Sequence, residues 1–278
     1  MQRRCDDIDT LAQDVVVKVA HLRDERNELE VPIHPDETLE TPLNKKLRII
    51  QGRNGYRYSI DAILLAHFCR LHEGNHVIDL GTGNAIIPIL LATRGFTERI
   101  IGVEIQADLV DAARRNVLIN GLTERIDIIH CNVRKLRDYL DRASFDVAIS
   151  NPPYRSIRSG RINPHPQKAF ARHEILGSLK DMARAASFLL RPRGRFHVVY
   201  PASRMVDMIV TLREFSFEPK RIQLVHSNVG EDARLVLAEA VKDGRGELKV
   251  MEPLFVYDPE GRYTPEMERI YSAFQSAP

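Results

Sequence analysis

The sequence predicts an α/β fold built on a mostly parallel sheet, and two observations carry that prediction. From residue 77 onward, short runs rich in β-branched residues alternate with helical stretches, and strands joined by helices pair in parallel through right-handed crossovers. The last two runs follow one another without a helix, which predicts an antiparallel hairpin near one edge. Seven strands are expected, at residues 77–80, 100–105, 125–130, 145–150, 195–200, 221–226 and 234–241. The intervening helices, at residues 84–94, 107–120, 175–190 and 203–214, are expected on both faces of the sheet.

The chain before this sheet follows a different pattern. Apolar side chains recur at helical spacing at the start, which predicts a short amphipathic helix within residues 11–29, followed by a proline-rich linker. A strand at residues 45–50 and a helix beginning at Ser59 or Ile60 lead into the sheet. The expected organisation is an acidic N-terminal extension and linker (1–44), the main α/β domain (45–245) and a C-terminal tail (246–278).

Composition and charge limit the class of protein. The three cysteines are far apart and the ten histidines show no ligand spacing, so neither a disulfide framework nor a metal site is expected. No signal peptide and no membrane-spanning run is recognised, which predicts a soluble, cytoplasmic protein. Residues 1–44 carry five Lys/Arg and eleven Asp/Glu, so the rest of the chain is strongly basic although the net charge is only +2. A basic body suits an anionic partner, and it is equally compatible with an ordinary solvated surface.

A glycine loop follows the first strand of the predicted sheet. Asp79-Leu80-Gly81-Thr82-Gly83 stands between a strand and a helix, where glycines allow the backbone and its N–H groups to approach a ligand. A dinucleotide fingerprint requires glycine where Ile86 stands, and no Walker lysine is present. The pattern therefore favours a nucleotide-like ligand without phosphates, and S-adenosylmethionine is such a ligand.

Polar residues at three successive strand ends support this cofactor. Asp79 suits the cationic amine of S-adenosylmethionine, and Glu104 at the end of the next strand can accept both ribose hydroxyls. Ile105 can pack on the adenine ring, and the amide oxygen of Asn132 can accept from the adenine amine. The carboxyl ends of neighbouring strands in an open α/β sheet form a ligand crevice, so these residues are expected to lie together.

The fourth strand ends on Asn151-Pro152-Pro153-Tyr154, beside the same crevice. The prolines fix their φ angles and donate no hydrogen bond, which leaves stiff backbone carbonyls as acceptors. The side-chain oxygen of Asn151 and the carbonyl of Pro152 can then accept from one planar NH₂ group, while Tyr154 stacks on a flat substrate. Two acceptors that hold an amine against a sulfonium methyl would catalyse transfer by positioning and electrostatics.

DLGTGNA (79–85), VEIQ (103–106) and NPPY (151–154) resemble the small-domain class of S-adenosylmethionine-dependent methyltransferases. Within that class the chain is most similar to the tRNA1(Val) adenine-N6-methyltransferases, which modify the adenine just 3′ of the anticodon. Residues 47–68, FARHEI (170–175) and the tail at 252–271 extend the resemblance, which covers about residues 36–272. It implies a Rossmann-like, seven-stranded class I methyltransferase sheet whose C-terminal strand is antiparallel.

The resemblance also implies roles for particular residues. Those of the glycine loop (Gly81, Thr82 and Gly83), with Glu104 and Asn132, would bind the cofactor, and Ser59 and Asp61 lie in the segment expected over its methionine part. Asn151, Pro152, Pro153 and Tyr154 would hold the target amine. The chain departs from the family pattern at Asn84 and Ala85, and at Asn132, where aspartate is usual.

The expected substrate is the N6 amine of an adenine in RNA, with adenine-37 of a tRNA favoured. A basic stretch without acids follows NPPY and suits a phosphate backbone; its basic residues are Arg155, Arg158, Arg161, Lys168 and Arg172. Arg191, Arg193 and Arg195 form a second cluster that suits either RNA or a helix cap. Three alternatives stay open: N5-methylation of a protein glutamine, guanine-N2 methylation of ribosomal RNA, and non-catalytic RNA binding. The expected protein is a monomer or homodimer that uses no metal and binds no membrane.

Overall fold

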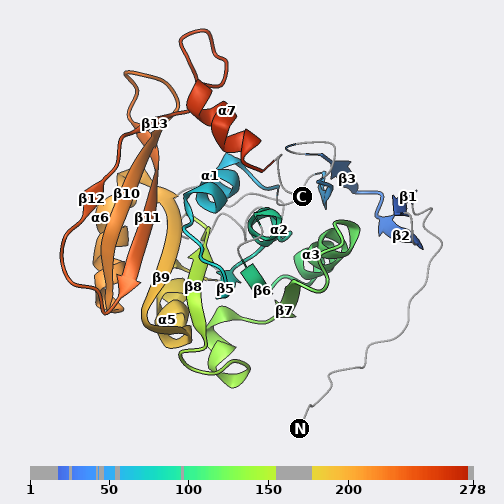
Figure 1. The fold of residues 1–278 in the computed structure, drawn as a ribbon, viewed down its shortest axis with the longest axis horizontal. Coiled ribbons are helices and arrows are strands. Elements are labelled where there is room, and N and C mark those ends of the chain that lie inside the picture. Colours follow the sequence, from blue (N-terminus) through green and yellow to red (C-terminus); the bar gives the residue numbers. More distant parts are fainter. Residues whose placement is uncertain are drawn as a thin grey trace.

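A computed structural model describes residues 18–24, 27–41, 43, 47–53, 57–94, 97–154 and 177–274. Its central sheet (Figure 1) has the strand order β12-β10-β11-β9-β8-β5-β6-β7, with β13 also paired to β10. The seven core strands are β5 (Asn75–Leu80), β6 (Thr97–Glu104), β7 (Ile126–His130), β8 (Phe145–Ser150), β9 (Leu190–Pro201), β10 (Phe217–His226) and β11 (Ala233–Lys242). Among these seven, β11 runs antiparallel to both of its neighbours and the other pairings are parallel. The predicted seven-stranded α/β sheet is therefore confirmed.

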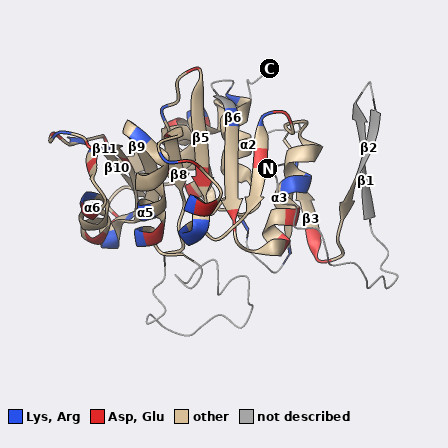
Figure 2. Ribbon diagram, turned by 90° about the horizontal axis from the view of Figure 1, so that it is seen from below, with Lys and Arg blue, Asp and Glu red and all other residues tan. Residues whose placement is uncertain are grey.

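Helices cover both faces of the sheet, as expected. The helices α1 (Ile60–Phe68), α2 (Ile86–Thr93), α3 (Ala107–Ile119) and α7 (Pro265–Ser272) share one hydrophobic cluster with Val77 of β5. The helices α5 (Leu179–Leu189) and α6 (Met205–Glu214), with the 3-10 turn η1 (Val133–Asp138), share the other cluster with Ile78. Successive residues of β5 thus enter different cores, as a doubly covered sheet requires. Figure 2 draws β5, β6 and β8 largely in tan, and the charged residues of β6 stand near its two ends.

The prediction of an amphipathic helix at residues 11–29 is wrong for the part of this segment that the structure describes. β1 (Lys18–Asp24) and β2 (Asn27–Ile33) form an antiparallel hairpin instead, in a register that pairs Leu22 with Leu29 and Ala20 with Val31. Cross-strand pairs are the stabilising unit of a sheet, and they are invisible in the spacing of apolar residues along one segment. A second small sheet pairs β3 (Glu37–Glu40) with β4 (Ile49–Gly52), which corresponds to the strand predicted at residues 45–50.

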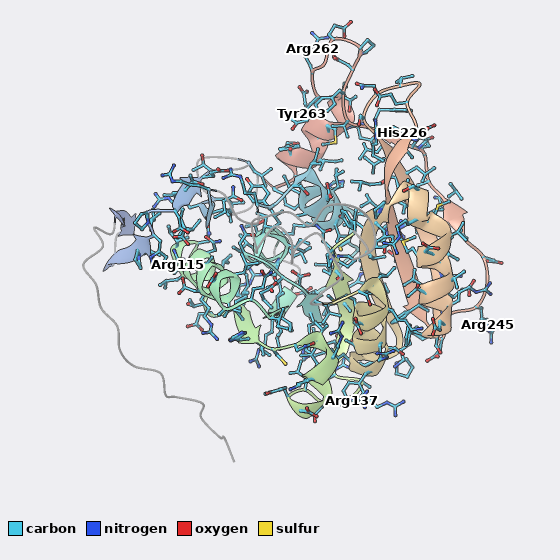
Figure 3. The ribbon with its side chains drawn as sticks, turned by 180° about the vertical axis from the view of Figure 1, so that it is seen from behind. Arg115, Arg137, His226, Arg245, Arg262 and Tyr263 are labelled. Atoms are coloured by element: carbon cyan, nitrogen blue, oxygen red, sulfur yellow. The ribbon has the colours of Figure 1, made fainter. Side chains whose placement is uncertain are left out.

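A buried arginine joins this N-terminal region to the main sheet. Arg115 of α3, labelled in Figure 3, donates to both carboxylate oxygens of Glu37 at 2.7 and 2.6 Å and to the Pro32 carbonyl at 2.9 Å. Its Nε also donates to Asp111 at 2.8 Å. This bidentate ion pair with Glu37 allows the Arg115 guanidinium to be buried and fixes β3 against α3.

The C-terminal tail packs on the sheet and on α1. The short strands β12 (Lys249–Val250) and β13 (Leu254–Phe255) pair in parallel with β10, and a turn then leads into α7. Met267, Ile270 and Phe274 are buried in the core that α1 shares. In Figure 3 the turn that carries Arg262 and Tyr263 projects beyond the body of the molecule. Within the described residues, no helix has the length and apolar character needed to cross a bilayer.

Candidate functional site

A cavity of about 570 Å³ opens at the carboxyl ends of the parallel strands, where an open α/β sheet places its ligands. It brings together seven of the residues predicted from the sequence: Gly81, Gly83, Glu104, Ile105, Asn151, Pro152 and Pro153. The remaining lining residues are Val103, Gln106, Leu109, Cys131, Val133, Gly177 and Met182. The glycine loop and the NPPY stretch therefore belong to one site.

The glycine loop is tied to the neighbouring strand. The N–H groups of Gly81 and Thr82 both donate to the carbonyl of Val103 at 2.9 Å. Gly81 and Gly83 have φ angles of +78° and +59°, the left-handed region that glycine enters without strain. These conformations turn the chain sharply from β5 toward α2 and leave the glycines on the cavity wall.

Glu104 is a buried carboxylate held by backbone donors. Its two oxygens accept from the N–H groups of Gly83 at 3.0 Å and of Ile105 and Gln106 at 2.9 Å each. Burial raises the pKa of Glu104, and the three backbone hydrogen bonds oppose that shift. A carboxylate has about four acceptor positions, so capacity for a ligand hydroxyl is left on the cavity side.

Asp79 is buried in a different way. Its side chain is fully inaccessible, and neither carboxylate oxygen has a hydrogen-bond partner among the described residues. Burial, with a smaller contribution from the Glu104 charge, raises the pKa of Asp79 to about 7; the Thr82 hydroxyl opposes that rise but forms no regular hydrogen bond with the carboxylate. A carboxylate without a partner is costly in an apolar interior, whereas an ammonium group placed beside it would form a charge-assisted pair. Glu104 lines the cavity, where it could accept from the ribose hydroxyls of S-adenosylmethionine; Asp79 does not line it, and its contact with the cofactor amine stays a prediction.

The NPPY stretch holds its tyrosine against α1. The Tyr154 hydroxyl donates to the Asp61 carboxylate at 2.9 Å and also contacts the side-chain oxygen of Asn151. The Tyr154 ring meets Tyr200 edge-on at 5.9 Å, and Arg204 donates to the Tyr154 carbonyl at 2.9 Å. Asp61 therefore positions Tyr154, a link across 93 residues that no local motif could reveal.

The other predicted residues that the structure describes, Asp61, Asp79 and Tyr154 among them, do not line the cavity. The amide oxygen of Asn132 accepts from the Arg134 N–H at 3.0 Å and caps η1, while its neighbours Cys131 and Val133 line the cavity. Thr82 is buried, and Ser59 is exposed at the start of α1. The cofactor contacts expected of these side chains stay predictions.

The two basic clusters have different outcomes. Arg155, Arg158, Arg161, Lys168 and Arg172 lie outside the described residues. Arg191 and Arg195 belong to β9, where they donate to Asp146 at 2.6 Å and to Asn75 at 3.0 Å. The start of β9 pairs with the start of β8, so these arginines lie at the amino-terminal ends of the parallel strands, whereas the cavity lies at their carboxyl ends. This second cluster therefore does not join the site.

Sequence reasoning missed the apolar wall of the cavity. Leu109 comes from α3, and Met182 comes from α5 on the other face of the sheet. Helical spacing marks both residues as core-facing, and only the tertiary fold directs them to a ligand. Across the described parts of the chain, no group of three or more His, Cys, Asp or Glu residues could hold a metal ion.

Comparison with known proteins identifies the family. The methyltransferase domain family matches residues 71–244. The tRNA1(Val) (adenine(37)-N6)-methyltransferases of Phocaeicola vulgatus and Porphyromonas gingivalis are each 27% identical to the chain. The first alignment covers 69% of this chain and 80% of the relative, and the second covers 83% and 92%.

The fold is shared with a solved structure as well. The crystal structure of a predicted O-methyltransferase, protein Atu636 from Agrobacterium tumefaciens, matches with a TM-score of 0.64 at 22% identity, over 77% of this chain and 96% of that one. The family resemblance drawn from the sequence is thus confirmed. The chain belongs to the methyltransferase domain family and is an S-adenosylmethionine-dependent methyltransferase.

Proposed function

We propose that this enzyme methylates the exocyclic N6 amine of an adenine in RNA, and that the adenine is nucleotide 37 of a tRNA. The observation that carries the proposal is the position of Asn151, Pro152 and Pro153 on the wall of the cavity that also contains Gly81 and Glu104. The relatives named as tRNA1(Val) (adenine(37)-N6)-methyltransferases support the choice of RNA and of this base.

The chemistry required of the protein follows from the target amine. The lone pair of an adenine N6 is delocalised into the ring, so the nitrogen is a weak nucleophile. The Asn151 side-chain oxygen and the Pro152 carbonyl would each accept one N6 hydrogen, which favours a pyramidal nitrogen with its lone pair directed at the methyl group. When bound, S-adenosylmethionine supplies that methyl group on a positively charged sulfur. Positioning and electrostatics then provide the catalysis, with no strong base needed beforehand, and the methylated nitrogen loses one of its two protons after transfer.

Tyr154 connects binding to this geometry. Its hydroxyl lies against both the Asn151 oxygen and the Asp61 carboxylate, and its one proton can be donated to only one of them at a time. An incoming amine would replace the hydroxyl on Asn151, while the bond to Asp61 keeps the Tyr154 ring beside the pocket. An unpaired anticodon-loop base reaches such a pocket at little cost, because it is already free of a duplex partner.

The same two acceptors would serve a glutamine carboxamide or the N2 amine of guanine. The decisive experiment incubates the purified enzyme and methyl-labelled S-adenosylmethionine with unmodified tRNA, ribosomal RNA and a release factor in parallel, followed by mass spectrometry of the hydrolysed products. N6-methyladenosine in tRNA alone supports the proposal. Label on glutamine or on guanine N2 would assign the same site to a different substrate.

A further inference from the structure

We propose that the surface formed by η1 and α5 binds backbone phosphates of the RNA strand next to the target adenine, an inference that rests on the proposed function. This surface surrounds a second cavity, of about 500 Å³, here named the η1–α5 cavity. Its lining residues are Val133, Arg134, Leu136, Arg137, Asp181, Arg184, Ala185 and Phe188.

The charge of the η1–α5 cavity is unbalanced in favour of cations. Three arginines and one acid line it, and that acid, Asp181, is shared by Arg134 at 2.9 Å and Arg184 at 3.6 Å. The Asp181 carboxylate also caps α5 by accepting from the N–H and hydroxyl of Ser178. Because the Asp181 carboxylate is shared between two arginines and the cap of α5, it neutralises the positive charge of the cavity only in part. The remaining positive charge attracts an anion.

Arg137 provides the least engaged guanidinium of the three. It is exposed and lies over the ring of Phe188, 5.9 Å from the centroid. Among the described residues it has no acidic partner. A flat aromatic support orients a guanidinium while leaving its N–H groups available, and those groups match the oxygens of a phosphate.

The position of the η1–α5 cavity ties it to methyl transfer. Val133 lines both this cavity and the cofactor cavity. On α5, Met182 lines the cofactor cavity, while its neighbours Asp181, Arg184 and Ala185 line the second one. The two cavities therefore lie on adjacent sides of the same elements, and a strand whose base enters the first passes close to the second.

RNA fits this surface better than an acidic protein segment does. The proposed substrate of the neighbouring site is an RNA base, and a polynucleotide brings a phosphate with every base. Arginine recognises phosphate through paired N–H donors, and each phosphate contact releases a condensed counterion. Binding through this surface therefore has a measurable salt dependence.

The test uses the double variant Arg137→Ala/Arg184→Ala, because both side chains are exposed and neither fixes the fold through a short ion pair. RNA binding is measured by fluorescence anisotropy against salt concentration. At about 0.7 per single-strand phosphate contact, we expect the salt slope to fall by about 1.4 and the affinity in ~0.1 M salt to fall about 25-fold. Arg137→Lys/Arg184→Lys keeps both charges and should keep most of the slope.

The matched control is Arg245→Ala/Arg262→Ala, which removes two arginines that do not line the η1–α5 cavity and that Figure 3 shows apart from Arg137. It should leave the slope and affinity near wild-type values, and cofactor affinity should be unchanged in every variant. An equal loss in this control would overturn the proposal, since net charge alone would then explain the effect. If wild-type enzyme methylates RNA and the Arg137→Ala/Arg184→Ala enzyme binds it normally, the proposal fails while the proposed function stands. Absence of any RNA binding or methylation by the wild-type enzyme would reject both.

Discussion

The buried carboxylate of Asp79 gives the most quantitative prediction. Asp79→Asn keeps the shape of the protonated side chain and removes the possibility of a buried, unpartnered charge. We expect this variant to bind S-adenosylmethionine weakly and yet to be more stable than wild type in the absence of cofactor at neutral and alkaline pH. A substitution can reduce function and raise stability together where an active-site group binds the ligand but destabilises the ligand-free protein.

The magnitude follows from linkage. Burial raises the pKa of Asp79 from 3.8 to about 7, roughly three units, and each unit corresponds to about 1.4 kcal/mol, so the effect is at most about 4 kcal/mol. Between these pH values the unfolded chain has already released the proton that the folded chain retains. The free energy of unfolding of the wild type therefore falls as pH rises from about 4 to about 7, and the loss persists above pH 7. Asp79→Asn lacks this decline.

The assay is urea denaturation of both cofactor-free proteins from pH 4 to pH 8.5, with cofactor affinity measured in parallel. The stability difference should be near zero at pH 4 and should open to a few kcal/mol by pH 8. Glu104→Gln provides the contrast, because an amide presents one oxygen instead of two to the N–H groups of Gly83, Ile105 and Gln106 and should destabilise the fold. A constant difference across this pH range, or native cofactor affinity in Asp79→Asn, would refute the reasoning.

Three further predictions concern the NPPY stretch and the N-terminal region. Asn151→Ala should reduce methyl transfer on the order of 100-fold while cofactor affinity stays near wild type; unchanged single-turnover transfer would exclude the two-acceptor mechanism. Tyr154→Phe keeps the ring and frees the Asn151 oxygen, so it should retain most activity, whereas Tyr154→Ala should raise the KM for RNA; equal kinetics of the two variants would contradict a stacking role. Arg115→Ala leaves Glu37 buried without its partner and should cost about 3–5 kcal/mol in denaturant unfolding; a loss below ~1 kcal/mol would show that the pair does not fix β3 against α3.

The sequence was most informative where function depends on backbone chemistry. Glycines between β5 and α2 widen the accessible range of φ, prolines after β8 fix φ, and both features are readable from residue type alone. Parallel pairing then places their strand ends at one edge, so the core of the candidate site could be predicted without coordinates.

The parts that could not be predicted depend on contacts between distant segments. The hairpin of β1 and β2 depends on pairing between two strands. The apolar residues of this segment happen to recur at helical spacing, so the sequence pattern predicts a helix instead. Asp61 was assigned to the cofactor because of its place in a motif, and only the fold shows its bond to Tyr154. Met182 reaches the cavity from the opposite face of the sheet. Each of these features needs tertiary geometry that local patterns do not contain.

The most direct test compares two tRNA transcripts that differ only at nucleotide 37, adenosine in one and guanosine in the other. Each is incubated with enzyme and methyl-labelled S-adenosylmethionine, digested to nucleosides and analysed by mass spectrometry. The proposed function predicts one N6-methyladenosine in the adenosine-37 transcript and no label in the other. Equal labelling of both transcripts, or label in N2-methylguanosine, would contradict it.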